Sequence, residues 1–111
     1  MSVIYPSPYK FIFLFPSITF VFLVFIFKTI ENKLGKSRLN EFHSHFSKIE
    51  YTENGGEKRH LTFEDTVYGP EYEPLMELVY RYGISPTFIC ESAGTQGIDA
   101  KSMKDYYMNL R

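Results

Sequence analysis

The sequence of 111 residues contains no tryptophan and a single cysteine, Cys90. One cysteine excludes an internal disulfide framework and any zinc site built from several cysteines. The 12 lysines and arginines nearly balance the 13 aspartates and glutamates, so no basic excess indicates nucleic-acid binding through bulk charge. The glycine-rich motifs that cradle phosphates are absent, as is the serine nucleophile elbow. The length allows one small domain, and we expect no nucleotide cofactor.

Charge is almost missing from the first quarter of the chain. Residues 1–27 contain one charged residue, Lys10, and all acidic residues come later. Phe11–Phe27 is an uncharged run of 17 residues, which would measure roughly 26 Å as a helix. Basic residues follow the run from Lys28 onward. The pattern predicts a transmembrane helix, with the following residues in the cytoplasm.

We therefore divide the chain into an apolar segment, residues 1–27, and a soluble-type domain, residues 28–111. Two other interpretations of the apolar segment remain open. It is a helix buried in a protein core, or it is a spurious N-terminal extension translated from AT-rich DNA, because Phe, Ile, Leu and Tyr have A/T-rich codons.

The later residues predict alternating helices and strands. Expected helical regions are Phe27–Leu34, a helix that opens at Gly69-Pro70 and ends at Gly83, and Asp99–Leu110. Expected strands are Phe42–Ser47 and Thr87–Cys90, the second covered on both faces, with a long polar loop over Lys48–Gly69. The order predicts an α/β fold with parallel strands. Two strands cannot close a sheet, which indicates part of a larger α/β fold.

Candidate functional residues follow these strands. His45 lies on the first strand, Glu91 directly follows the second, and Glu57 and His60 lie in the long loop. Because sites in parallel α/β folds form at the carboxyl ends of strands, these side chains are expected to converge. Imidazole and carboxylate groups suit Zn²⁺, Mn²⁺ or Mg²⁺. The alternatives are a hydrogen-bonded packing role for the strand histidine and simple solvation for the loop charges.

The stretches HSHFSKIEYTENGGEKRHLTFED and YGPEYEPLMELVYRYGISPTFICESAGTQGIDAKSMKDYY resemble the C-terminal end of the endonuclease IV-like, xylose isomerase-like TIM barrels (AP endonuclease family 2), particularly archaeal members. The resemblance covers about Phe27–Leu110. It implies about the last two βα units of a (β/α)₈ TIM barrel, preceded by the apolar helix. Glu41–Ser47 would be the seventh strand, Thr87–Cys90 the eighth and Ile98–Leu110 the last helix.

The resemblance also implies the chemistry. His45, His60 and Glu91 match zinc ligands, and Glu91 would also be catalytic. The family's Asp-x-His motif reads Lys58-Arg59-His60 here, so its carboxylate is missing, and the adjacent Glu57 is a candidate substitute. Lys58 and Arg59 are candidate contacts to phosphate.

The implied activity is metal-dependent hydrolysis of phosphodiesters at abasic sites in DNA repair, with zinc, manganese or magnesium as cofactor. DNA is the expected partner, and a membrane would be contacted through residues 11–27. A barrel needs about 250 residues, so we interpret the chain as a fragment that is inactive alone. Two alternatives remain: a sugar (phosphate) isomerase or epimerase of the same superfamily, and a small single-pass membrane protein with a cytoplasmic interaction domain.

Overall fold

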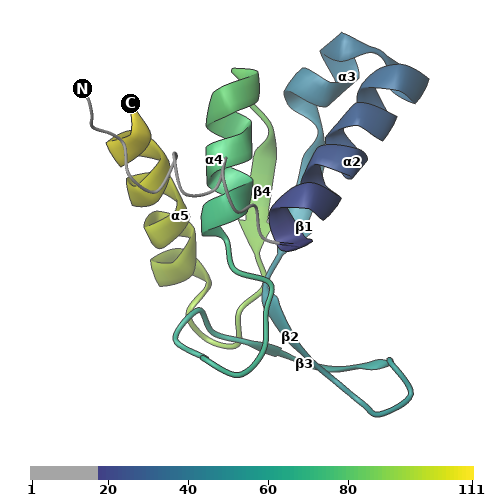
Figure 1. The fold of residues 1–111 in the computed structure, drawn as a ribbon. Helices are drawn as coiled ribbons and strands as arrows, with labels where there is room; N and C mark the ends of the chain where they lie inside the picture. The colour runs from purple at the N-terminus through teal and green to yellow at the C-terminus, as the bar shows by residue number, and fades with distance from the viewer. Residues whose placement is uncertain (1–17) are drawn as a thin grey trace.

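The computed structural model describes residues 18–111, which form a small α/β fold (Figure 1). The elements, in chain order, are α2 (Ile18–Leu34), α3 (Lys36–Glu41), β1 (His43–Phe46), β2 (Lys48–Tyr51), β3 (Glu57–Leu61), α4 (Glu73–Tyr82), β4 (Thr87–Cys90) and α5 (Gln96–Leu110). α4 lies between α5 and α2, and the hairpin of β2 and β3 extends away from the helices (Figure 1).

β1 and β4 pair in parallel, with His45 opposite Ile89. Backbone hydrogen bonds continue the pairing beyond both strand ends: the Thr87 N–H donates to the Phe42 carbonyl at 2.9 Å, and the Glu91 N–H donates to the Phe46 carbonyl at 3.0 Å. α4 lies in the connection between the two strands. The pairing brings the C-terminal end of β1 beside the residue that follows β4.

Among residues 18–111, helices cover one face of this two-stranded sheet and leave the other open. Phe46 and Cys90 point toward the helices and are partly or fully buried, whereas His45 and Ile89 lie on the opposite, exposed face. Ile89 is 43% exposed. The expectation that Thr87–Cys90 is covered on both faces is therefore wrong for the described residues. The open face leaves the His45 side chain accessible.

The hydrophobic core lies between the sheet and α2, α4 and α5. Phe27 on α2 is 1% exposed, and its ring makes edge-to-face contacts with Phe42 at 5.5 Å and Tyr82 at 5.3 Å between centroids. Leu39 and Leu78 complete this buried centre. Burying a side chain of this size contributes roughly 1.5–3 kcal/mol, so the contacts of Phe27 fix α2 against the body.

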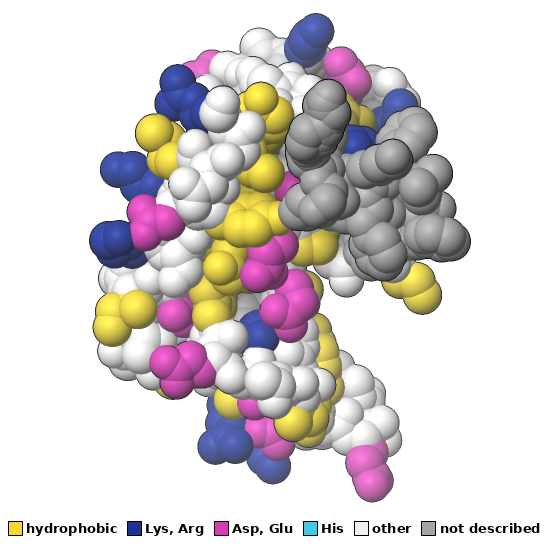
Figure 2. All heavy atoms as spheres, turned by 60° about the vertical axis from the view of Figure 1, so that its left-hand side comes forward, with side chains coloured by type: hydrophobic (Ala, Val, Ile, Leu, Met, Phe, Trp, Pro, Cys, Tyr) yellow, Lys and Arg dark blue, Asp and Glu magenta, His cyan; other side chains and the backbone are white. Residues whose placement is uncertain are grey.

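Hydrophobic side chains also reach the surface on the α5 side of the molecule. Figure 2 shows them as a band bordered by separate Lys, Arg, Asp and Glu side chains. Ile98 is 69% exposed and Met108 is 47% exposed on this helix. α5 is therefore less fully shielded from solvent than α4, which carries five buried residues in a row, Leu75–Val79.

The segment expected to be a long polar loop contains an antiparallel hairpin instead. β2 pairs with β3, and Glu50 lies opposite Arg59. The turn between them uses Gly55 at a φ of 83°, which a residue with a Cβ adopts only with strain. Lys48, at the start of β2, is buried and donates to the Asp65 carbonyl, and its ammonium lies 3.0 Å from Glu71. These contacts tie the base of the hairpin to the body.

Two glycines end helices as the sequence predicts. Gly35 follows α2 with a φ of 94°, and Gly83 follows α4 in the left-handed conformation. A further short helix, α3, begins directly after Gly35, which the sequence analysis did not predict. α4 begins at Glu73 rather than at Gly69-Pro70, with Pro74 in its first turn, where its missing N–H is tolerated.

The prediction that the chain forms part of a TIM barrel is wrong for the described residues. The strands form two separate two-stranded sheets, one parallel and one antiparallel. A (β/α)₈ barrel requires a closed ring of parallel strands. The parallel pair is too small to curve into such a ring, and the hairpin adds its strands to a different sheet.

The prediction of a transmembrane helix is also wrong for the described residues. In residues 18–111, no helix combines the length and the apolar composition needed to cross a bilayer. α2 has 17 residues, and its C-terminal half carries Lys28, Glu31 and Lys33. The expected helix began at Phe11, and its first residues, up to Ser17, lie outside the described residues.

Candidate functional site

Imidazole and carboxylate side chains meet on the open face of the sheet, at the C-terminal ends of β1 and β4. Glu91, directly after β4, is in hydrogen-bonding contact through Oε2 with Nδ1 of His45. Its Oε1 lies 3.7 Å from Nε2 of His60 on β3. Glu57, at the start of β3, lies 3.0 Å from the same His60 nitrogen. We call these four residues, His45, Glu57, His60 and Glu91, the histidine–glutamate cluster.

The cluster is assembled by three separate elements. β1 supplies His45, the hairpin strand β3 supplies Glu57 and His60, and the loop after β4 supplies Glu91. The parallel register places His45 one residue before the end of the β1–β4 pairing, beside the backbone that leads into Glu91. The hairpin then brings His60 over this strand end.

Ser47 fixes the orientation of His60. The Ser47 hydroxyl oxygen lies 2.6 Å from Nδ1 of His60, and Ser47 is 6% exposed. Because two carboxylates face Nε2, the proton is favoured on that nitrogen, and Nδ1 then accepts a hydrogen bond from the Ser47 hydroxyl. A buried partner on one ring nitrogen holds the imidazole so that the other nitrogen points into the cluster.

The cluster is open to solvent. The side chains of His45 and Glu57 are each 52% exposed, that of Glu91 is 38% exposed and that of His60 is 33% exposed. The pKa of the Glu91 carboxyl lies below its ordinary value, chiefly because of the hydrogen bond with His45. Glu91 is therefore a carboxylate at neutral pH, and its negative charge faces both imidazole rings.

The donor types fit a divalent cation, since zinc and manganese bind imidazole nitrogen and carboxylate oxygen. The arrangement does not complete a site. Within residues 18–111, no three His, Cys, Asp or Glu side chains are placed to hold a metal ion. The contacts are instead pairwise, His45 with Glu91 and His60 with Glu57 and Glu91. A cation would have to displace these pairs and draw further ligands from elsewhere.

Lys58 and Arg59, the two basic residues of the hairpin, contact a carboxylate outside the cluster. Glu50 on β2 accepts a hydrogen bond from Nε of Arg59 at 2.6 Å and lies 3.2 Å from the Lys58 ammonium. These contacts lower the pKa of Glu50, with the Arg59 hydrogen bond the largest cause. Both basic side chains remain more than half exposed.

A cavity of about 380 Å³ adjoins the cluster on the hairpin side. Arg59 and His60 line it together with Thr62 and Ala93. Glu64 and Asp65 add carboxylates to its wall, and Asp65 is engaged by the backbone N–H groups of Val67 and Tyr68. A group bound in this cavity would lie beside Arg59 and His60 and would face the carboxylates of Glu64 and Asp65.

All four members of the cluster are candidate functional residues by sequence, but the residues that support them are not. Ser47 shares the strand face of His45 by the alternation of side chains, which was the available signal. Glu50 could be found only from the pairing of β2 with β3. His43 lies outside the cluster, although its ring is 5.6 Å from that of His45.

Comparison with known proteins gives a relative whose activity is not known. An uncharacterised protein of Methanocaldococcus jannaschii is 37% identical over 67 residues, a stretch that covers 60% of this chain and 23% of that protein. The chain thus matches about a quarter of the length of its curated relative. No family model matches the chain, and no solved structure matches it.

Proposed function

We propose that the histidine–glutamate cluster contributes ligands to a divalent cation in a metal-dependent phosphodiesterase that cleaves DNA at abasic sites. The observation that carries the proposal is the position of Glu91, whose carboxylate faces His45 and His60 from two other elements. The sequence resemblance of Phe27–Leu110 to endonuclease IV-like proteins supplies the substrate class. The activity belongs to a larger assembly of residues than the cluster alone, because catalytic zinc sites need three protein ligands, and no three such side chains are placed to hold an ion within residues 18–111.

The proposed roles follow from the geometry of the chain. His45, His60 and Glu91 would bind the cation, and Glu57 is the additional carboxylate beside His60. Ser47 keeps Nε2 of His60 directed into the cluster. When bound, a divalent cation supplies Lewis-acid stabilisation of charge on a phosphodiester oxygen. Glu91 holds a proton on Nδ1 of His45 as long as the two remain paired.

The hairpin supports binding of a phosphate beside the cluster. Glu50 holds Lys58 and Arg59 in place, with one carboxylate oxygen beside the Lys58 ammonium and the other beside Nε of Arg59. The Arg59 side chain is 68% exposed and lines the cavity next to His60. Arginine presents several donors in a planar fork, so a guanidinium that already binds Glu50 through Nε retains donors for a phosphate.

Metal binding tests the cluster directly. We expect the chain to bind Zn²⁺ or Mn²⁺ in isothermal titration calorimetry and the Glu91→Gln variant to bind at least about tenfold more weakly, since it loses the shared carboxylate. His43→Ala is the matched control, because His43 lies on the same strand face but outside the cluster. Equal affinity of the Glu91→Gln variant and the unmodified chain would contradict the assignment.

Activity tests the substrate class. The substrate is a DNA duplex with one tetrahydrofuran abasic analogue, and the measurement is the length of the labelled product with Zn²⁺ or Mn²⁺ added. We expect little or no cleavage by this chain alone, because its described residues do not complete a metal site. A longer relative that carries a glutamate at the position of Glu91 should cleave at the analogue, and changing that glutamate to glutamine should abolish the cleavage. Absence of cleavage by the longer relative, or cleavage that survives the change of its glutamate to glutamine, would refute the phosphodiesterase proposal.

A further inference from the structure

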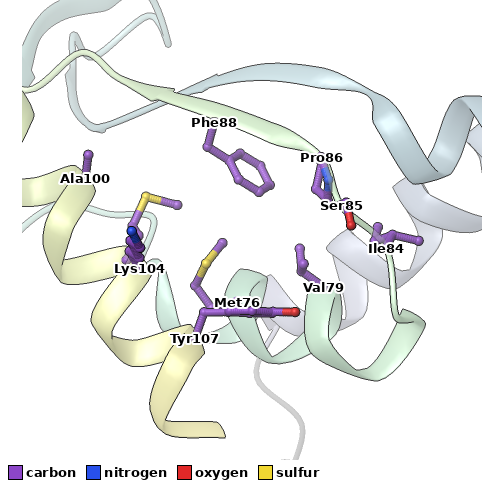
Figure 3. A pocket seen from close by; sticks show the side chains of 10 residues that line it. Met76, Val79, Ile84, Ser85, Pro86, Phe88, Ala100, Lys104 and Tyr107 are labelled. Carbon is purple, nitrogen blue, oxygen red and sulfur yellow. The ribbon is translucent and has the colours of Figure 1, made fainter. Parts of the chain in front are cut away.

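A second cavity lies on the helical side of the molecule, away from the histidine–glutamate cluster. It has a volume of about 340 Å³, is open to solvent, and is lined by α4, α5 and the segment Ile84–Phe88 (Figure 3). Its size falls in the range of pockets that hold small molecules, roughly 300–1,000 Å³. None of its lining residues belongs to the cluster.

The floor of this cavity is apolar. Met76 and Val79 of α4 and Met103 of α5 line it, and each is no more than 5% exposed. Phe88 reaches in from β4 on the side opposite Met76 (Figure 3). Thioether side chains have several rotatable bonds and adapt to irregular ligand shapes. The floor thus suits the apolar body of a ligand.

The rim carries one positive charge. Among the described residues that line the cavity, Lys104 is the one with a charged side chain. It lies one turn from Ala100 and next to Tyr107 along a single face of α5, and both of these also line the cavity (Figure 3). Tyr107 and Ser85 add hydroxyl groups to the lining.

No carboxylate in residues 18–111 forms an ion pair with Lys104. The neighbouring Lys101 differs, because its ammonium lies 2.5 Å from Asp105. Asp99, five residues before Lys104 on α5, is buried and accepts hydrogen bonds from the Phe63 N–H and the Thr95 hydroxyl. Lys104 therefore places at the rim of an apolar cavity a positive charge that no carboxylate of residues 18–111 pairs with.

We propose that this cavity binds small amphipathic carboxylates, with an aliphatic or aromatic body on the methionine-lined floor and the carboxylate at Lys104. The complementarity of the two halves carries the inference: the floor offers no partner for a polar body, and the rim favours an anionic head group. This site is independent of the cluster and of the phosphodiesterase proposal, because the two share no residue.

Three ligands of equal chain length separate the parts of the proposal. We expect decanoate to bind in isothermal titration calorimetry, decanol to bind about fivefold more weakly, and decyltrimethylammonium to bind more weakly still. The fivefold factor corresponds to about 1 kcal/mol, the upper range for a solvent-accessible ion pair. Decanol binding as tightly as decanoate would overturn the role of Lys104.

Two variants test the location. Lys104→Met should weaken decanoate binding about fivefold and leave decanol binding unchanged, whereas Lys101→Met on the same helix should change neither. Ala100→Leu should block both ligands by filling the cavity, and because Ala100 is exposed and leucine favours helices, α5 is expected to stay folded. Circular dichroism checks the fold of each variant. Decanoate that does not bind, or that binds equally to Ala100→Leu, would refute the proposal.

Discussion

Glu77 lies on α4 with its side chain completely shielded from solvent. The Tyr106 hydroxyl donates a hydrogen bond to its Oε1 at 2.8 Å, while Oε2 has no hydrogen-bond partner among the described residues. Burial raises the pKa of Glu77, and the Tyr106 hydrogen bond and the charge of Arg81 only partly oppose this effect. Burying a charged carboxylate with one unsatisfied oxygen destabilises the fold.

Replacing Glu77 with glutamine should stabilise the protein at neutral pH and leave it little changed in acid. Well below pH 4.5, the ordinary pKa of a glutamate, folded and unfolded chains both hold the Glu77 proton. As the pH rises above that value, the unfolded chain releases the proton more readily than the folded chain, so the unmodified protein loses stability until the raised pKa is passed. A glutamine side chain at this position would keep the acceptor for Tyr106 and cannot ionise. We expect a gain of about 1 kcal/mol at pH 7.5.

Urea unfolding between pH 4.5 and 8, followed by circular dichroism, measures this gain. Glu64→Gln is the control, because Glu64 is exposed and its loss removes a negative charge without removing a buried one. The free energies of unfolding of Glu77→Gln and the unmodified chain should differ more as the pH rises. A difference that stays constant over this pH range would show that the ionisation of Glu77 does not cause it.

At the scale of single residues, the sequence indicated the members of the cluster but not the residues that contact them. His45 and Glu91 were identifiable because each stands at the carboxyl end of a predicted strand, where parallel strands expose their side chains together. Glu50 and Ser47 were missed because their roles depend on the hairpin, which places Glu50 opposite Arg59 and Ser47 beside His60. Contacts across a strand pair that was not predicted cannot be read from composition.

At the scale of elements, the backbone conformation of a glycine decides the effect of replacing it with alanine. Gly83 ends α4 in the left-handed conformation with a φ of 63°, so Gly83→Ala should destabilise the protein by about 1 kcal/mol. Gly97 lies in the first turn of α5, and a Cβ added there meets no atom within 4 Å. Gly97→Ala should stabilise the protein by about 0.5 kcal/mol because alanine favours the helix.

Thermal unfolding of the two alanine variants tests this contrast, since the same substitution is made in both and only the backbone conformation differs. The melting temperature should fall for Gly83→Ala and rise for Gly97→Ala. Two shifts in the same direction would show that backbone conformation does not dominate at these positions.

The strands show what sequence patterns reveal. Phe42–Ser47 and Thr87–Cys90 were predicted within two residues of β1 and β4, because their alternating or apolar residues are bounded by turns. β2 and β3 were missed, since their strands are short and polar. Asn54-Gly55 between them was the available signal, because this pair favours hairpin turns. A polar hairpin depends on cross-strand contacts such as Glu50 with Arg59 rather than on an apolar pattern.

At the scale of the whole molecule, α2 presents an apolar face that the described residues do not cover. Ile18, Val21, Phe22 and Phe25 are 54% to 88% exposed and follow helical spacing along one side of α2. Phe27, which turns inward, is 1% exposed. An exposed apolar stripe of this kind favours association between molecules.

The double substitution Phe22→Ser and Phe25→Ser should therefore reduce concentration-dependent association in sedimentation velocity experiments. Folding should be preserved because neither side chain is in the core. Asn32→Ser is the control, since Asn32 lies two turns beyond Phe25 on the same side of α2 and is already polar. Association that is equal in the double variant and the unmodified chain would assign it to another surface.

The barrel prediction failed at this scale for a physical reason. Residue patterns correctly indicated two strands and the helices around them, but the number of strands in a sheet is set by long-range pairing. In the described chain, β1 and β4 pair with each other, and β2 and β3 form a second sheet. A resemblance that rests on local segments therefore does not by itself predict a closed sheet.

The parallel pairing of β1 with β4 also imposes an order of events during synthesis. The 40 residues from Ser47 to Pro86 must be made after β1 before β4 exists to pair with it. At ribosomal rates of about 5–20 residues per second, this delay is roughly 2 to 8 seconds. During that interval His45 has no Glu91 to meet, and the edge of β1 is available to any chaperone that binds extended chains. The strand pairing that waits longest for its partner to be synthesised is therefore also the one that assembles the site.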